Sequence, residues 1–197
     1  MIPARQKSAK EIAEERDREH ERYDVYEQRQ VDERLRYVFK RLDTKRDGLI
    51  DAEEVALMLV QLGCEARAKG GKNTDREAVL EAMPGVAAPA DMIWEVDERG
   101  DGSLSWEEFS NAYFRVVRDE TGAEPRKLFA LIEFLMLDED EVGWVTLDQI
   151  LRMMMMRHQD IGGIIKAKFD DGSPGVKQIS FREYVLAGAP PSGVLEK

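Results

Sequence analysis

The segment that decides the fold is MIWEVDERGDGSLSWEEFSNAYF, residues 92–114. An apolar helical pattern leads into an acidic loop, and a second helical pattern follows the loop. Oxygen-bearing side chains stand at positions 1, 5, 9 and 12 of the loop, which runs from Asp97 to Glu108, and Gly102 stands at position 6. Alternate residues of such a loop can converge on one point, and glycine permits the sharp turn between them. The spacing therefore predicts a helix–loop–helix unit with the ligands of a hard cation.

The same design occurs again before and after this segment. Residues 35–59 repeat it, with Gly48 at position 6 of the loop and carboxylates at positions 1, 5, 9 and 12. A third copy, residues 128–154, keeps the glycine but has Val142 at position 5 and Gln149 at position 12. The third copy is therefore expected to have lost its metal chemistry.

A fourth copy, residues 164–186, has an altered loop. Asp170 to Glu183 spans fourteen residues instead of twelve and includes Pro174. Position 8 nevertheless holds a branched aliphatic residue in all four copies, as expected if the loops pair through short antiparallel strands. These four residues are Ile50, Leu104, Val145 and Ile179.

This repeated pattern is that of the EF-hand, and residues 92–109 resemble the calmodulin superfamily at about ten constrained positions. The resemblance implies an all-α protein with two EF-hand pairs, that is four hands, mostly degenerate, behind an N-terminal helical extension. We expect a charged helical arm at 1–30, a first lobe at 31–118 with an insertion at about 64–89, a degenerate second lobe at 119–188, and a tail at 189–197.

Calcium is the cofactor that this pattern implies, at the first two loops only. Position 3 of those loops holds Lys45 and Arg99 in place of an oxygen ligand. A cation about 5 Å from calcium would cost on the order of 1–2 kcal/mol even with water-like screening, so binding is expected to be weak. The candidate ligands are Asp43, Asp47, Leu49, Asp51 and Glu54 in the first loop, and Asp97, Asp101, Ser103, Ser105 and Glu108 in the second.

Composition restricts the function further. The chain of 197 residues has 29 Lys and Arg against 40 Asp and Glu, a net charge of −11, which argues against non-specific nucleic-acid binding. Cys64 is the single cysteine, which indicates a reducing compartment. The sequence contains neither an apolar run long enough to cross a membrane nor an enzyme motif. We therefore expect a cytoplasmic protein that is not an enzyme.

A protein partner is the remaining expectation. The methionine run at 153–156 lies on the exiting helix of the third hand, and four consecutive helical residues cannot all face one core. Met155 and Met156 are therefore candidates for contact with a partner, and core packing is the competing interpretation for the run.

Residues 92–137 also resemble EF-hand proteins of ciliary and flagellar axonemes, with the calmodulin-type subunit of the outer-dynein-arm docking complex as the nearest suggestion. That resemblance implies a structural or regulatory subunit of a microtubule-associated assembly, bound to helical segments of its partners, with weak or vestigial calcium binding. The alternative is a free cytosolic calmodulin-like calcium sensor that binds target helices.

Overall fold

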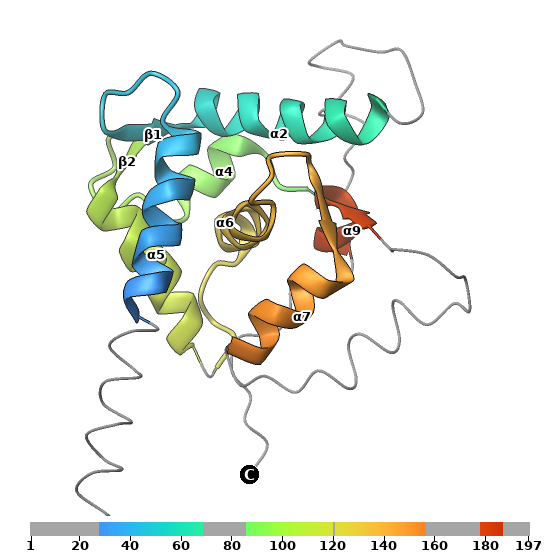
Figure 1. The fold of residues 1–197 in the computed structure, drawn as a ribbon. Helices are drawn as coiled ribbons and strands as arrows, with labels where there is room; N and C mark the ends of the chain where they lie inside the picture. The colour runs from blue at the N-terminus through green and yellow to red at the C-terminus, as the bar shows by residue number, and fades with distance from the viewer. Residues whose placement is uncertain (1–27, 69–85, 120, 157–177, 187–197) are drawn as a thin grey trace, which may run out of the picture. The chain divides into compact units, whose positions relative to one another are not determined.

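A computed structural model describes residues 28–68, 86–119, 121–156 and 178–186 (Figure 1). The chain divides into two compact units, Met1–Tyr37 and Val38–Lys197. A helix occupies residues 28–42, and its first ten residues are the described part of the first unit. Most of the predicted arm and all of the predicted tail lie outside the described residues, so their bounds stay predictions.

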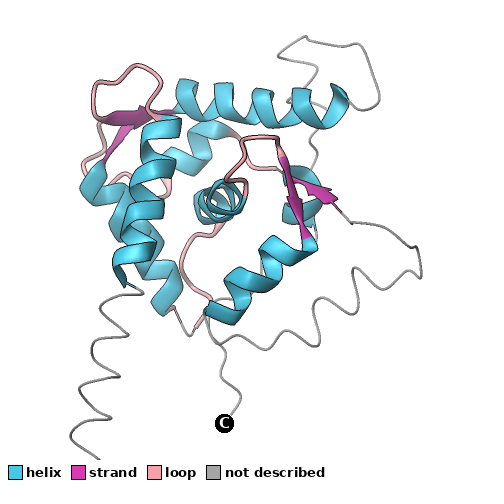
Figure 2. Ribbon diagram, viewed as in Figure 1, coloured by secondary structure: helices cyan, strands magenta, loops and turns pink. Residues whose placement is uncertain are grey.

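The second unit is built from helices and very short strands (Figure 2), which confirms the all-α prediction. In chain order the elements are β1 (Leu49–Asp51), α2 (Ala52–Ala68), α4 (Pro89–Trp94), β2 (Ser103–Ser105), α5 (Trp106–Arg118), α6 (Lys127–Leu137), β3 (Trp144–Thr146), α7 (Leu147–Met156), β4 (Gln178–Ser180) and α9 (Phe181–Leu186).

The loops pair as their aliphatic residues predict. β1 and β2 form one antiparallel pair in which Ile50 lies opposite Leu104. β3 and β4 form the other, in which Val145 lies opposite Ile179. Ile50, Leu104 and Val145 are fully buried, so each strand pair attaches two loops to the apolar interior. The first hand therefore pairs with the second, and the third with the fourth.

The first three loops share one backbone conformation. The position-6 glycines have φ between 74° and 82°, and position 4 is also left-handed at Arg46, Gly100 and Glu141. A left-handed conformation is strained for a residue with a side chain and costs glycine nothing. The third loop keeps this path although its ligand side chains are changed, so the backbone does not depend on a full ligand set.

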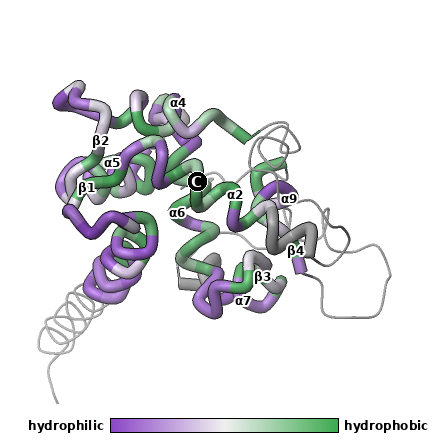
Figure 3. Tube along the Cα trace, turned by 90° about the horizontal axis from the view of Figure 1, so that it is seen from above, coloured by the Kyte–Doolittle hydropathy of each residue, from purple (hydrophilic) through white to green (hydrophobic). Residues whose placement is uncertain are grey.

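α6 lies at the centre of the second unit, where Figure 1 shows it end-on. Its residues from Leu128 to Leu137 are all buried, and it contacts α4, α5, α7 and α9. Figure 3 shows the hydrophobic character of this helix. A helix that is apolar all round is stable only inside a core. Within α6 the buried carboxyl group of Glu133 accepts a hydrogen bond of 3.0 Å from the Tyr184 hydroxyl.

The two hand pairs pack on each other. α2, from the first pair, contacts β4 and α9 from the second, and α4 contacts α6. The Arg41 side chain adds a polar link, because its Nη1 and Nη2 atoms donate to the carbonyl and carboxylate oxygens of Asp138 at 3.0 and 2.9 Å. Across the described part of the chain, no helix is long and apolar enough to cross a membrane.

Candidate functional site

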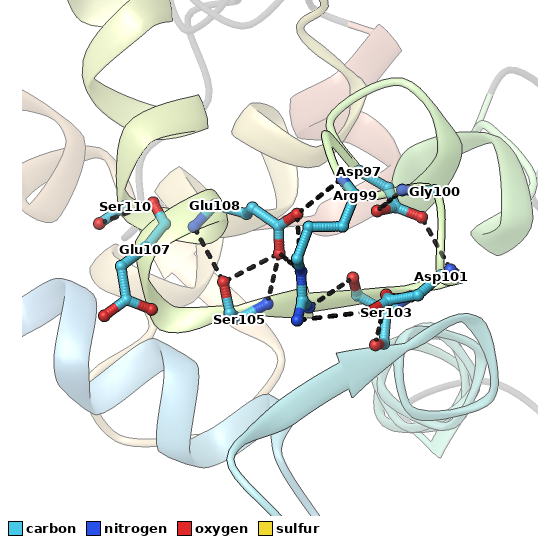
Figure 4. Close-up of polar contacts among 10 residues, drawn as sticks. Asp97, Arg99, Gly100, Asp101, Ser103, Ser105, Glu107, Glu108 and Ser110 are labelled. Atoms are coloured by element: carbon cyan, nitrogen blue, oxygen red, sulfur yellow. Dashed lines mark hydrogen bonds and ion pairs between the residues drawn. The ribbon is translucent and has the colours of Figure 1, made fainter.

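The second loop is held together by the side chain of Arg99 (Figure 4). Its Nε lies 3.1 and 3.0 Å from the two carboxylate oxygens of Glu108, at position 12. Its Nη1 lies 3.2 Å from Oδ2 of Asp101, at position 5, and its Nη2 lies 3.5 Å from the carbonyl oxygen of Ser103, at position 7. The guanidinium group therefore contacts three of the predicted calcium ligands.

The remaining ligand positions of this loop bind backbone groups. Asp97, at position 1, accepts hydrogen bonds from the Gly100 amide at 2.8 Å and the Gly102 amide at 2.7 Å. Ser105, at position 9, accepts a hydrogen bond from the Glu108 amide through its hydroxyl oxygen at 3.3 Å. These bonds hold the turn and begin α5.

The position-12 side chain caps the exiting helix in all four hands. In each hand it accepts a hydrogen bond from the backbone amide of position 9, at 2.7 to 3.1 Å. The position-9 side chain accepts one in return from the position-12 amide, so the two residues form a capping box. The four position-12 residues are Glu54, Glu108, Gln149 and Glu183. Position 12 therefore has a structural role that requires no metal ion.

The first loop binds its own cation differently. Lys45 forms an ion pair with Asp51, at position 9, and its Nζ lies 3.6 Å from Glu53. Glu54, at position 12, accepts hydrogen bonds from the Lys45 amide at 3.0 Å and the Thr44 hydroxyl at 3.2 Å. The ammonium group thus lies at the rim of the loop, on position 9, whereas the guanidinium of the second loop reaches position 12.

Position 1 of the third loop, Asp138, pairs with Arg41 from the entering helix of the first hand. Asp138 accepts hydrogen bonds from the amides of Val142 and Gly143 at 2.9 and 3.2 Å, as position 1 accepts loop amides in the first two loops. Its ion pair with Arg41 is buried, with side-chain exposures of 5% for Arg41 and 0% for Asp138. A protein cation therefore lies on a ligand carboxylate in each of the first three loops.

These contacts shift the acidities of the loop groups. Burial raises the pKa of the Glu108 carboxyl, but hydrogen bonds from Ser105 and Arg99 outweigh it and lower that pKa to about 2. In the first loop, the hydrogen bond between Lys45 and Asp51 raises the pKa of the lysine and lowers that of the aspartate. The lowered pKa values keep the carboxyl groups of Asp51 and Glu108 ionised at neutral pH.

The predicted ligands lie in the two loops at the expected positions, with the positive charge of Lys45 or Arg99 among them. Calcium takes six to eight oxygens at 2.3–2.6 Å, and no group of three acidic, histidine or cysteine side chains converges on a common point within the described ranges. In this conformation the guanidinium group of Arg99 binds ligand oxygens of the second loop, while the EF-hand family match is consistent with calcium as a possible cofactor of the first two loops.

The sequence pattern does not reveal Arg41 as a partner of the third loop, because Asp138 lies 97 residues away and no local motif marks the pair. Met155 and Met156 belong to α7 by backbone, but their side chains lie outside the described part of the molecule. Their contact with a partner stays a prediction.

Comparison with known proteins agrees with this geometry. Residues 32–114 match the family model described as an EF-hand domain pair. The chain is 28% identical over 159 residues to troponin C isoform 1 of Drosophila melanogaster. The matched region covers 78% of this chain and 91% of that protein.

Two further similar proteins match over shorter segments. A probable calcium-binding protein, CML30, of Oryza sativa subsp. japonica is 43% identical over 75 residues, which are 38% of this chain and 26% of that protein. An EF-hand domain-containing protein D1 of Mus musculus is 34% identical over 104 residues, which are 53% of this chain and 35% of that protein. The chain thus spans about a quarter and about a third of these two proteins.

Proposed function

Because the chain is an EF-hand protein of the calmodulin superfamily, we propose that it is a non-enzymatic structural or regulatory subunit of a larger assembly, with weak or vestigial calcium binding. The observation that carries this proposal is the occupation of the second loop by Arg99. A hand whose ligands already bind a protein cation has little to gain from calcium. The EF-hand family match is consistent with calcium as a possible cofactor at the first two loops.

The packing of the hand pairs supports a constant shape. A calcium sensor exposes an apolar groove by opening a helix pair. Here α6 is buried along its length between the two hand pairs, and the ion pair between Arg41 and Asp138 joins these pairs. A body of this kind suits a subunit that is recognised by its partners in one conformation.

Protein partners are the expected ligands of this body. Trp94, at the end of α4, is 81% exposed, and Leu57 and Val117 are further exposed apolar side chains. Large amphipathic rings are enriched where proteins bind each other. We assign partner contact to the exposed Trp94 and to the predicted residues Met155 and Met156.

The finer proposal concerns the assembly itself. The resemblance of residues 92–137 to axonemal EF-hand proteins supports a cytoplasmic, cytoskeletal location in a cilium or flagellum, in association with microtubules and dynein. Fractionation of purified axonemes tests this directly. The chain should remain with the microtubule fraction after detergent extraction, and its release with the soluble matrix would contradict the axonemal assignment.

Calcium titration tests the general proposal. Isothermal titration calorimetry of the full chain should show no saturable heat at micromolar calcium, because sensor sites bind with dissociation constants of roughly 10⁻⁷ to 10⁻⁵ M. Two sites in that range, together with exposure of hydrophobic surface on loading, would refute the structural role.

A free calcium sensor is the second candidate, and the first loop favours it. Asp43 and Asp47 accept hydrogen bonds from loop amides, and the ammonium group of Lys45 pairs with Asp51 at position 9. One similar protein is named a probable calcium-binding protein. If this candidate is correct, the first loop should bind calcium in the micromolar range and the protein should then capture an amphipathic target helix that it does not bind in chelator.

A further inference from the structure

The side chain of Arg99 occupies the place in the second loop where a ligand to the metal would stand. Position 3 ordinarily supplies an oxygen to the ion, and here it supplies a guanidinium group that turns toward the other ligands (Figure 4). Its nitrogens reach Glu108, Asp101 and the Ser103 carbonyl, which are positions 12, 5 and 7. The group that the sequence leads one to regard as a repelling charge is thus the binding partner of these oxygens.

Exposure and geometry agree with a bound cation. The Arg99 side chain is 46% exposed, whereas the Glu108 side chain is 6% exposed, so the guanidinium group covers the carboxylate from the solvent side. The planar guanidinium presents several donors in a fixed fork and can bind more than one acceptor at once. A single side chain can therefore satisfy oxygens that a metal ion would otherwise collect.

We propose that Arg99 is the resident cation of the second loop, which holds this hand in its closed conformation without calcium and which calcium must displace in order to bind. Lys45 is not its equivalent, because the ammonium group pairs with position 9 and leaves position 12 to backbone and hydroxyl donors. The two loops of one pair thus differ in how strongly they resist metal, and the second resists more.

The inference is tested with Arg99→Asn, which replaces the cation by a neutral oxygen ligand. Arg118→Asn is the matched control, since it removes the same charge from the exposed end of α5, outside the loop. Calcium is titrated into the full-length wild type and both variants, and the Gly102 amide is followed by backbone-assigned NMR because it donates to Asp97 inside the loop. The affinity of the second loop should rise about tenfold in Arg99→Asn, and less than about twofold in the control.

The calcium-free state supplies a second measurement. In chelator, amide exchange at Gly102 and Ser103 should be slow in the wild type and faster in Arg99→Asn, and calcium should restore protection only in that variant. If Arg99→Asn does not fold, Arg99→Lys keeps the charge but not the fork, and its loop amides should exchange faster than those of the wild type. Wild-type exchange rates in these loop variants would overturn the proposal.

The inference rests on the proposed weakness of calcium binding, and the titration separates the two. Micromolar binding at the second loop of the wild type would overturn both. Weak binding that Arg99→Asn leaves unchanged would overturn the role of Arg99 alone and leave the structural function standing.

Discussion

Replacement of Arg41 by methionine should destabilise the protein strongly, because it leaves the carboxylate of Asp138 buried without its cation. The guanidinium donates to both the carboxylate and the carbonyl of that residue, and the two side chains are 5% and 0% exposed. Methionine keeps much of the volume of the arginine stem. Removal of one partner of a buried ion pair costs about 3–5 kcal/mol, a large share of the ~5–15 kcal/mol that holds a domain folded.

Urea denaturation of a double-mutant cycle measures this cost. Asp138→Asn removes the charge and keeps an acceptor oxygen for one of the two amides, since Val142 and Gly143 donate to different carboxylate oxygens. The double variant should therefore be more stable than Arg41→Met alone. Relative to the wild type, both variants that lack Arg41 also lose its Nε, which is buried with no hydrogen-bond partner among the described residues. We expect a coupling energy of about 2 kcal/mol or more.

Arg36→Met is the matched control. Arg36 pairs with Asp32 at 3.0 Å one helical turn away, but the two side chains are 55% and 42% exposed. Exposed pairs of this spacing contribute about 0.3–0.5 kcal/mol. If Arg41→Met costs no more than this control, or if the cycle shows no coupling, the hand pairs are not held together by the ion pair and the argument fails.

Three further changes test other parts of the core and loops. In the folded protein the pKa of Glu108 is lowered from 4.5 to about 2. The ionised carboxylate therefore contributes at most about 3 kcal/mol to the free energy of unfolding, which is present above pH 4.5 and lost as the pH falls towards 2. In urea titrations, the difference in stability between the wild type and Glu108→Gln should narrow over that range. Tyr184→Phe removes the hydroxyl that donates to the buried Glu133 and should cost about 1–3 kcal/mol by calorimetry. Leu104→Ala, opposite Ile50 in the strand pair, should cost about 2–5 kcal/mol, and a cost below 1 kcal/mol would contradict its placement in the core.

The sequence predicted the elements whose causes are local. Position 8 is apolar and branched in every loop because the strand pair must be buried on one side, and the register of Ile50 with Leu104 follows from that requirement. Position 6 is glycine in the first three loops because the chain turns there with positive φ. Such features are readable because each depends on a few neighbouring residues.

Contacts over long sequence separations were beyond the same reasoning. Nothing near Arg41 indicates that it will pair with Asp138, since the choice depends on how one hand pair packs on the other. The direction of Arg99 was also undetermined, because a long side chain at position 3 can turn away from a metal ion or toward the ligands. Sequence spacing gives the position of a charge in the loop, and only the fold gives its partners.

The capping boxes give position 12 a role in the fold that does not depend on a metal ion. A position-12 side chain whose only role was to bind calcium would have no role without the ion. Here it accepts a hydrogen bond from the position-9 amide in each of the four hands. Gln149 does so with an amide oxygen at 2.7 Å, so the cap requires an acceptor and not a charge. Glu108 adds a bond to Arg99, which does require the charge. A glutamate at position 12 is therefore weak evidence of calcium binding in this protein, and the residue at position 3, which decides what that glutamate binds, is the stronger evidence.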